Sequence, residues 1–92
     1  MIRNFNHKGL REFWESGSTV GIQSDQATRI RVRLTAMNVA AEIAELNLPG
    51  WALHELKGDR AGTWSLKVNA SWRLTFRFEE GDCADVVLEQ YH

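Results

Sequence analysis

The sequence predicts a single α+β domain, residues 1–92, in which an antiparallel sheet packs against N-terminal helices. Apolar residues recur with helical spacing in the first half of the chain and with the two-residue period of strands after Gly50. No helical pattern separates the strands, so a parallel sheet is not expected. The 92 residues, 43% of them hydrophobic, suffice for one compact core.

Two helices are expected in the first half. Residues 1–5 predict a short strand, and residues 7–16 predict a helix capped by Asn6 and stopped by Gly17. The apolar side chains on one face of this helix are Leu10, Phe13 and Trp14. A longer helix is predicted from a cap at Ser24 or Asp25 to Leu48, before Pro49, with its period carried by Ile30, Leu34, Met37, Ala41 and Ala44.

The second half of the chain predicts three antiparallel strands. The apolar positions that alternate along the first two strands are Trp64, Leu66 and Val68, then Trp72, Leu74, Phe76 and Phe78. Residues 69–71 form a connection of hairpin length, and a second turn at residues 80–82 precedes a strand over residues 84–91. We expect the longer helix to cover the apolar face of this meander.

The charge of the chain leaves only a local patch for nucleic-acid binding. The net charge is −1, without the basic excess typical of nucleic-acid binding proteins. However, residues 54–78 carry five basic and two acidic side chains, whereas residues 79–92 carry five acidic and no basic ones. Strand alternation predicts that Lys67, Arg73 and Arg77 share the face opposite the core. The alternative is that these are ordinary solvated strand residues.

Two pairs of residues are candidates for chemistry. His54 and Lys57 are polar and three positions apart, but in an extended strand they point to opposite faces, so a shared site requires a turn at or before Lys57. Tyr91 is expected on the polar face of the last strand, and His92 at the end of the sheet. The alternatives are a surface pair and a frayed terminus.

Several classes of function are disfavoured by missing motifs. The sequence has no CxxC, HExxH, GxxxxGK[ST] or GxSxG motif, and three dispersed histidines do not form a ligand cluster. The single cysteine, Cys83, favours a reducing compartment, and we expect the cytoplasm. We expect no membrane or export role, because the uncharged runs are far shorter than the ~20 residues of a bilayer span and the N-terminus lacks a signal-peptide pattern.

Three segments together resemble the HigB toxin family of the RelE superfamily. They are LKGDRAGTWS at residues 56–65, VNASWRLTF at residues 68–76 and the closing YH at residues 91–92. The "LKGxRxG" and "WRxxF" patterns are shared widely in the superfamily, whereas "LHxLKG" with a terminal "YH" is more specific to HigB. The resemblance extends from Met1 to His92.

The resemblance implies a compact α+β ribonuclease fold and a role in a type II toxin–antitoxin system. It implies cleavage of messenger RNA in the ribosomal A site by metal-independent attack of the 2′-hydroxyl, with no cofactor. The expected partners are the ribosome with its message and a HigA-type helix-turn-helix antitoxin, through which alone the toxin would reach operator DNA.

The resemblance also assigns roles to residues. It maps His54, Lys57, Tyr91 and His92 to catalytic positions and makes Arg73 a phosphate contact. The neighbouring cations that would add to RNA binding are Lys67, Arg77 and Arg60. Either histidine could be the general base or acid. Gln90 departs from the family pattern, which has Asp before the closing Tyr-His, and this amide predicts a weak toxin.

Two other functions stay open at this stage. The related ParE toxins share the superfamily fold but inhibit gyrase without cutting RNA. The chain could also be an attenuated or regulatory toxin that mainly binds its antitoxin, which Gln90 favours. The His54/Lys57 pair and the closing Tyr-His favour the nuclease.

Overall fold

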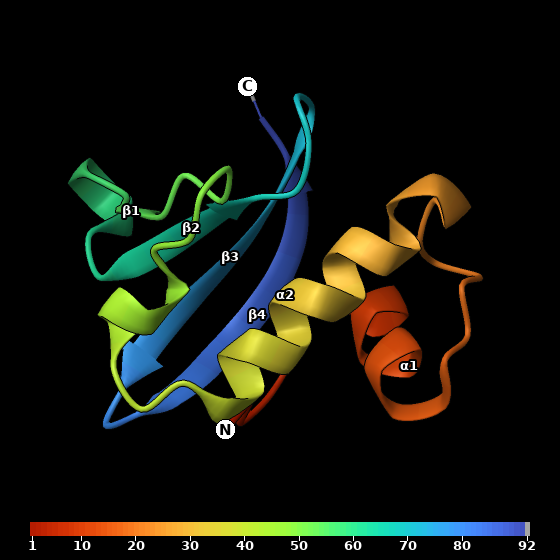
Figure 1. Cartoon of the computed structure of the whole chain (residues 1–92), viewed down its shortest axis with the longest axis horizontal. Helices are drawn as coiled ribbons and strands as arrows, with labels where there is room; N and C mark the ends of the chain where they lie inside the picture. The colour runs from red at the N-terminus through yellow and green to blue at the C-terminus, as the bar shows by residue number, and fades with distance from the viewer. Residues whose placement is uncertain (92) are drawn as a thin grey trace.

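A four-stranded antiparallel sheet with two helices on one of its faces forms the fold, as seen in a computed structural model that describes residues 1–91 (Figure 1). The helices are α1 (Lys8–Ser16) and α2 (Ala27–Val39). The strands are β1 (His54–Glu55), β2 (Thr63–Lys67), β3 (Trp72–Glu79) and β4 (Asp82–Gln90), and each is adjacent to the next in the sheet. Short 3₁₀ turns are η1 (Ser24–Gln26), η2 (Ile43–Leu46) and η3 (Gly58–Arg60). The predicted α+β class is confirmed.

One face of the sheet and both helices enclose the core. Helix α2 lies across β4, and α1 packs against α2 on the side away from the sheet (Figure 1). The buried side chains that meet there include Leu10, Phe13, Ile30, Leu34, Met37, Leu66, Leu74, Phe76, Val86 and Leu88. Because the helices occupy only this face, the alternate residues of the strands are left for polar chemistry. Within residues 1–91, no helix is long and apolar enough to cross a bilayer.

The start of α1 differs from the prediction. Its N-cap is His7 and not Asn6, because the Nδ1 atom of His7 accepts a hydrogen bond from the backbone N–H of Leu10 at 3.0 Å. Burial lowers the pKa of His7, which favours the neutral ring that this bond requires. The predicted stop is confirmed: Gly17 has φ 80° and donates its N–H to the carbonyl of Phe13 at 2.9 Å.

Helix α2 is shorter than predicted. It ends at Val39 and not at Leu48, since Ala40 is extended with ψ 129°. A new turn, η2, then starts with a capping box in which the Glu45 carboxylate accepts from the backbone N–H of Glu42 at 2.7 Å. The core-facing residues of this segment are Ile43 and Leu46, whereas Ala41 and Ala44 are exposed.

The sheet has one strand more than the meander predicted from the sequence. Strand β1 pairs with β2 through His54 opposite Ser65 and Glu55 opposite Trp64. Both β1 residues are exposed. A strand of two exposed residues carries no hydrophobic alternation, so the pattern could not reveal it.

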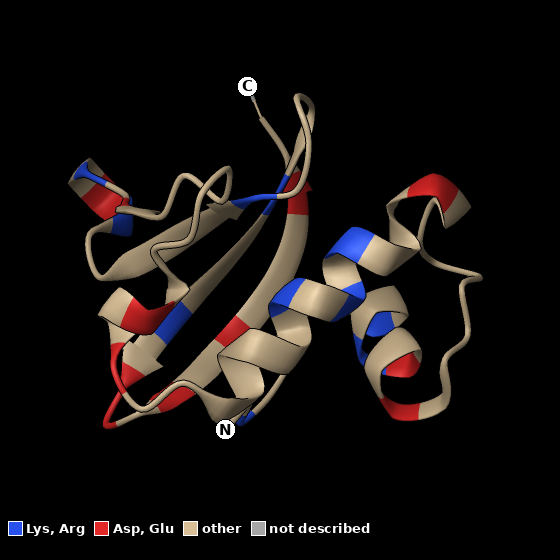
Figure 2. Ribbon diagram, in the orientation of Figure 1, with Lys and Arg blue, Asp and Glu red and all other residues tan. Residues whose placement is uncertain are grey.

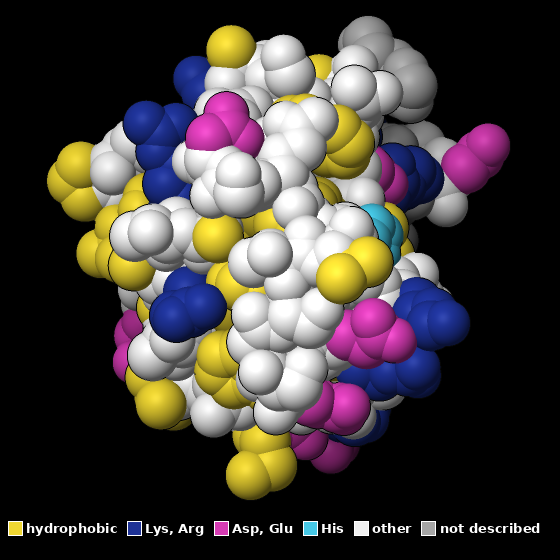
Figure 3. All heavy atoms as spheres, turned by 90° about the vertical axis from the view of Figure 1, so that its right-hand side faces the viewer, with side chains coloured by type: hydrophobic (Ala, Val, Ile, Leu, Met, Phe, Trp, Pro, Cys, Tyr) yellow, Lys and Arg dark blue, Asp and Glu magenta, His cyan; other side chains and the backbone are white. Residues whose placement is uncertain are grey.

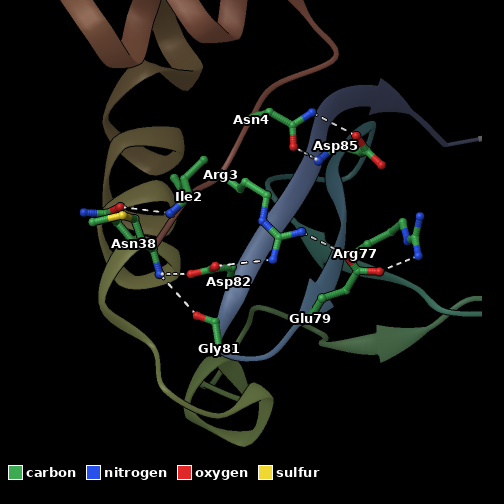
Figure 4. Close-up of polar contacts among 10 residues, drawn as sticks. Ile2, Arg3, Asn4, Asn38, Arg77, Glu79, Gly81, Asp82 and Asp85 are labelled. Carbon is green, nitrogen blue, oxygen red and sulfur yellow. Dashed lines mark hydrogen bonds and ion pairs between the residues drawn. The ribbon is translucent and has the colours of Figure 1, made fainter.

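The N-terminal segment runs beside β4. Residues 1–5 form two isolated parallel bridges to β4, at Ile2 and Phe5, and not a continuous strand. Between these bridges β4 bulges at Asp85, whose φ is 54°. Figure 4 shows Asn4 against this bulge: its side-chain amide donates to Asp85 Oδ1 at 2.9 Å, and its Oδ1 accepts from the Asp85 N–H at 3.0 Å. The bulge shifts the register of the β3–β4 pair.

Candidate active site

Polar side chains line the face of the sheet opposite the helices. The register places Lys67 opposite Arg73 and Arg73 opposite Glu89, so these three share one face of β2, β3 and β4. The next row on that face consists of His54, Ser65, Thr75 and Val87. The predicted placement of Lys67, Arg73 and Arg77 on one face of the strands is confirmed.

The centre of this face is a carboxylate shared by two arginines. Glu89 Oε1 accepts from Arg60 Nη1 at 2.7 Å, from Arg73 Nε at 3.0 Å and from Arg73 Nη2 at 2.8 Å. Its Oε2 accepts from Arg60 Nη2 at 3.2 Å. Arg60 therefore binds the carboxylate with both arms of its guanidinium, which fixes orientation as well as distance. We call Arg60, Arg73 and Glu89 the arginine–glutamate cluster.

The pKa of Glu89 reports the balance of forces in this cluster. Partial burial raises the pKa of Glu89, but the hydrogen bonds and charges of Arg60 and then Arg73 outweigh that effect, and the net pKa is below its usual range. The hydrogen bond to Glu89 raises the pKa of Arg60 in turn. The carboxylate is therefore ionised at neutral pH.

The loop between β1 and β2 places Arg60 over the sheet. Arg60 ends η3, and the loop is closed by Glu55, whose Oε2 accepts from the N–H of Gly62 at 2.9 Å. Gly62 has φ 93°, a conformation that favours glycine. Arg60 Nη2 also lies 3.5 Å from the hydroxyl of buried Thr75. The glycine-containing segment thus holds a charged side chain above β3 and β4.

Tyr91 joins the cluster from the end of β4. Its backbone N–H donates to the carbonyl of Ser71 at 2.9 Å, which continues the pairing of β4 beyond Gln90. The guanidinium carbon of Arg73 lies 5.2 Å from the centre of the Tyr91 ring, a cation–π distance. Tyr91 therefore lies on the polar face, as its position in the strand predicts.

His54 lies on the same face at the edge strand. Its Nδ1 is 2.9 Å from the carbonyl oxygen of Ala52. A carbonyl only accepts, so Nδ1 carries the proton in this contact and the neutral ring has its free lone pair on Nε2. Ala52 has φ 48°, so a strained turn presents its carbonyl. Thr75 lies two strands away from His54, about 10 Å at the usual strand spacing.

The other predicted site residues lie around this face. Lys57 is exposed and extended, and η3 begins only after it, so residues 54–57 lack the turn at or before Lys57 that a shared site with His54 requires. Arg77 is exposed and ion-paired with Glu79. Gln90 is exposed and opposite Trp72, on the alternate face from Glu89. His92 lies outside the described residues.

Sequence reasoning missed the position of Glu89 in the cluster and the burial of two hydroxyls on the polar face. Thr75 and Ser65 are buried although they lie on the polar face, and the Ser65 hydroxyl has no hydrogen-bond partner among the described residues. The alternation that places Tyr91 also places Glu89 on this face. Its pairing with Arg73 requires the register of β3 and β4, which the bulge shifts and the sequence does not display.

The helical side of the molecule offers no comparable constellation among the described residues. An open depression between α1 and α2 is lined by Phe13, Trp14, Gly17, Arg31 and Thr35. Figure 3 shows this side, where hydrophobic side chains lie scattered between charged ones. Within residues 1–91, no group of three or more His, Cys, Asp or Glu is arranged to hold a metal ion.

Comparisons of the sequence with known proteins indicate one family, and a comparison of structures shows a similar fold. Residues 3–92 match the family of HigB-like toxins, described as RelE-like toxins of type II toxin–antitoxin systems. The chain is 48% identical to the endoribonuclease HigB of Proteus vulgaris over 92 residues, the full length of both. Its fold is similar to a chain of the YoeB–YefM complex from Staphylococcus aureus, with a TM-score of 0.56, 16% identity, and coverage of 100% of this chain and 99% of the other.

Proposed function

The chain belongs to the family of HigB-like toxins, RelE-like toxins of type II toxin–antitoxin systems, and from this premise we propose that it is an endoribonuclease that cuts messenger RNA in the ribosomal A site. The relative from Proteus vulgaris carries the name endoribonuclease at 48% identity over the whole chain. The cut is made by attack of the 2′-hydroxyl on the adjacent phosphorus.

The arginine–glutamate cluster is the observation that carries this proposal. Attack on phosphorus builds negative charge on the phosphoryl oxygens, and fixed guanidinium groups stabilise that charge. Arg73 is half-buried and held from two sides, by Glu89 and by the Tyr91 ring, so its position is set before the substrate arrives. Arg60 and Lys67 extend the cationic surface on either side of it.

In this proposal the imidazoles of His54 and His92 transfer the protons. His54 has its Nε2 lone pair free in the neutral ring, which suits it to accept the proton of the 2′-hydroxyl. His92 then returns a proton to the leaving 5′-oxygen, or the two histidines exchange these roles. Lys57, the exposed residue immediately before η3, supplies a further charge to the phosphate.

In this proposal Tyr91 contacts a base of the message, and the ribosome holds the message in place. The Tyr91 ring is half-buried beneath Arg73 and can stack on or orient a base. The net charge of −1 provides no strong general attraction to RNA. If the ribosome holds the message, the enzyme needs only a small basic platform, and this supports dependence on the ribosome as the reason for the low charge.

The partners follow from the type of system. A toxin of this type is paired with an antitoxin, here a HigA-type helix-turn-helix protein, and reaches operator DNA only in that complex. Ribosomes and messages meet in the cytoplasm, so the toxin acts there. A gene for a helix-turn-helix protein beside the toxin gene would support this arrangement.

Primer extension on translated transcripts tests the function. Induction of the toxin without its antitoxin should produce new RNA ends inside codons, while free RNA is cut poorly. Growth inhibition with intact messages and impaired gyrase would support a ParE-like inhibitor. Antitoxin binding without either effect would indicate a regulatory toxin.

A further inference from the structure

Two positively charged groups stand close together on the polar face because one carboxylate lies between them. Arg60 and Arg73 come from different segments, η3 and β3, and their guanidinium groups both contact Glu89 Oε1, at 2.7 and 2.8–3.0 Å. Without an anion between them, two like charges at this separation repel. The exposed loop side chain of Arg60 would then be the one free to move.

We propose that Glu89 is a positioning residue, which holds Arg60 and Arg73 together as a preassembled phosphate site. The inference rests on the proposed function, because it names what organises that same site. Glu89 contacts no reacting atom. It acts through the two arginines.

The geometry leaves the arginines able to bind phosphate while they bind Glu89. Arg73 directs its Nε and Nη2 edge to Glu89, so its Nη1 points away from that carboxylate, and its flat face covers Tyr91. Arg60 uses one Nη1 hydrogen and both Nη2 hydrogens on Glu89 and Thr75, so its Nε–H and second Nη1 hydrogen are left for a phosphate. A site fixed in this way spends no energy on reorganisation during the reaction.

A carboxylate-to-amide substitution tests this role. Glu89→Gln keeps the size and one acceptor oxygen but removes the charge, and Glu89→Asp keeps the charge on a shorter arm. In single-turnover cleavage on programmed ribosomes, we expect Glu89→Gln to lower the maximal rate constant about 10- to 100-fold. The ribosome concentration that gives half of the maximal rate should change less than about twofold. We expect Glu89→Asp to recover part of that loss. The matched control is Asp82→Asn, which also removes a carboxylate of β4 paired to an arginine, Arg3, and should leave the rate unchanged.

A spectroscopic measurement makes the test independent of activity. The ¹⁵N signals of the side-chain Nε–H groups of Arg60 and Arg73 should shift and lose exchange protection in Glu89→Gln but not in Asp82→Asn. If Glu89→Gln unfolds, a second pair of variants decides. Arg60→Gln in the Glu89→Asp background should then reduce kcat less than the product of the two single effects, because both act on one site.

Three results would overturn the proposal. A folded Glu89→Gln enzyme that cuts as fast as the wild type shows that the carboxylate positions nothing. A faster one shows that Glu89 competes with the substrate phosphate for the arginines. If the rate of the double variant equals the product of the two single effects, Arg60 and Glu89 do not act together. A wild-type protein that fails to cut message on ribosomes refutes the proposed function instead, and the arginine signals still report whether Glu89 fixes the site.

Discussion

At the scale of single residues, Lys57 and Arg73 should differ in their effect on stability while both affect the rate. Lys57 is exposed, so Lys57→Ala should change the free energy of unfolding by less than ~0.5 kcal/mol. Arg73 is half-buried and donates twice to Glu89, so Arg73→Ala should cost about 1–2 kcal/mol. Both should lower single-turnover cleavage roughly 100-fold or more. Urea unfolding and cleavage rates on ribosomes measure the two effects. Loss of activity in strict parallel with stability would identify both residues as structural.

Gln90 and His92 give a second prediction at this scale. An amide supplies no charge to orient a catalytic imidazole or to raise its basicity, so Gln90→Asp should increase ribosome-dependent cleavage and growth inhibition. The Glu89 carboxylate, which could have served instead, is engaged by Arg60 and Arg73. Deletion of His92 should reduce cleavage if its imidazole transfers a proton. Unchanged rates in a folded Gln90→Asp enzyme would remove the explanation for a weak toxin, and an unimpaired deletion would leave His54 as the remaining imidazole of the site.

At the scale of elements, the cap of α1 makes stability depend on pH. The His7 imidazole accepts the N–H of Leu10 only when its Nδ1 is unprotonated, and burial lowers the pKa of His7 in the folded chain. This contribution, about 1 kcal/mol for a cap, is therefore fully present above the unfolded pKa near 6.5 and is lost as the pH falls through the lower folded value.

His7→Asn tests this cap, because asparagine caps a helix without titrating near neutral pH. Between pH 7.5 and 5.0, the free energy of unfolding should fall more for the wild type than for His7→Asn, as measured by urea unfolding. His7→Ala should lose the cap at both pH values. Equal pH profiles for the wild type and His7→Asn would show that the imidazole does not stabilise the helix.

The elements also show where sequence patterns stop being informative. The stop at Gly17 was predictable because a left-handed glycine ends a helix by local geometry alone. The end of α2 was not, since residues 40–48 suit a helix and the break depends on a cap formed by Glu42 and Glu45. The candidate site residues lie in segments that resemble those of the family, but the place of Glu89 among them became visible only from the register of β3 and β4 with the bulge at Asp85.

At the scale of the whole molecule, the charges divide between two ends. Acidic residues gather around the β3–β4 turn and η2 (Figure 2). The turn lies against the segment that leads into η2: a Cβ added at Gly81 would be 3.5 Å from the carbonyl oxygen of Ala41. This end carries Glu42, Glu45, Glu79, Glu80 and Asp82, against the three cations of Arg3, Arg77 and the N-terminal amine, which pair with Glu79 and Asp82. The arginine–glutamate cluster lies toward the opposite end of the sheet, where Trp72 pairs with Gln90. An RNA chain is therefore attracted to one end and repelled from the other.

This division predicts weak binding of free RNA with a small dependence on salt. The cations available near the cluster are Lys57, Lys67, Arg60 and Arg73, and the two arginines already share a carboxylate. Each phosphate that is neutralised on a single strand contributes about −0.7 to the slope of log K against log salt, so the slope should not be steeper than about −3. Lys67→Ala should reduce it by about 0.7, whereas Lys8→Ala, on the helical side, should leave it unchanged. Fluorescence anisotropy with a labelled single-stranded RNA across a salt series measures these slopes. A slope steeper than about −5, or an equal effect of Lys8→Ala, would show that RNA binds over much more of the surface, and the ribosome would then not be needed to hold the message.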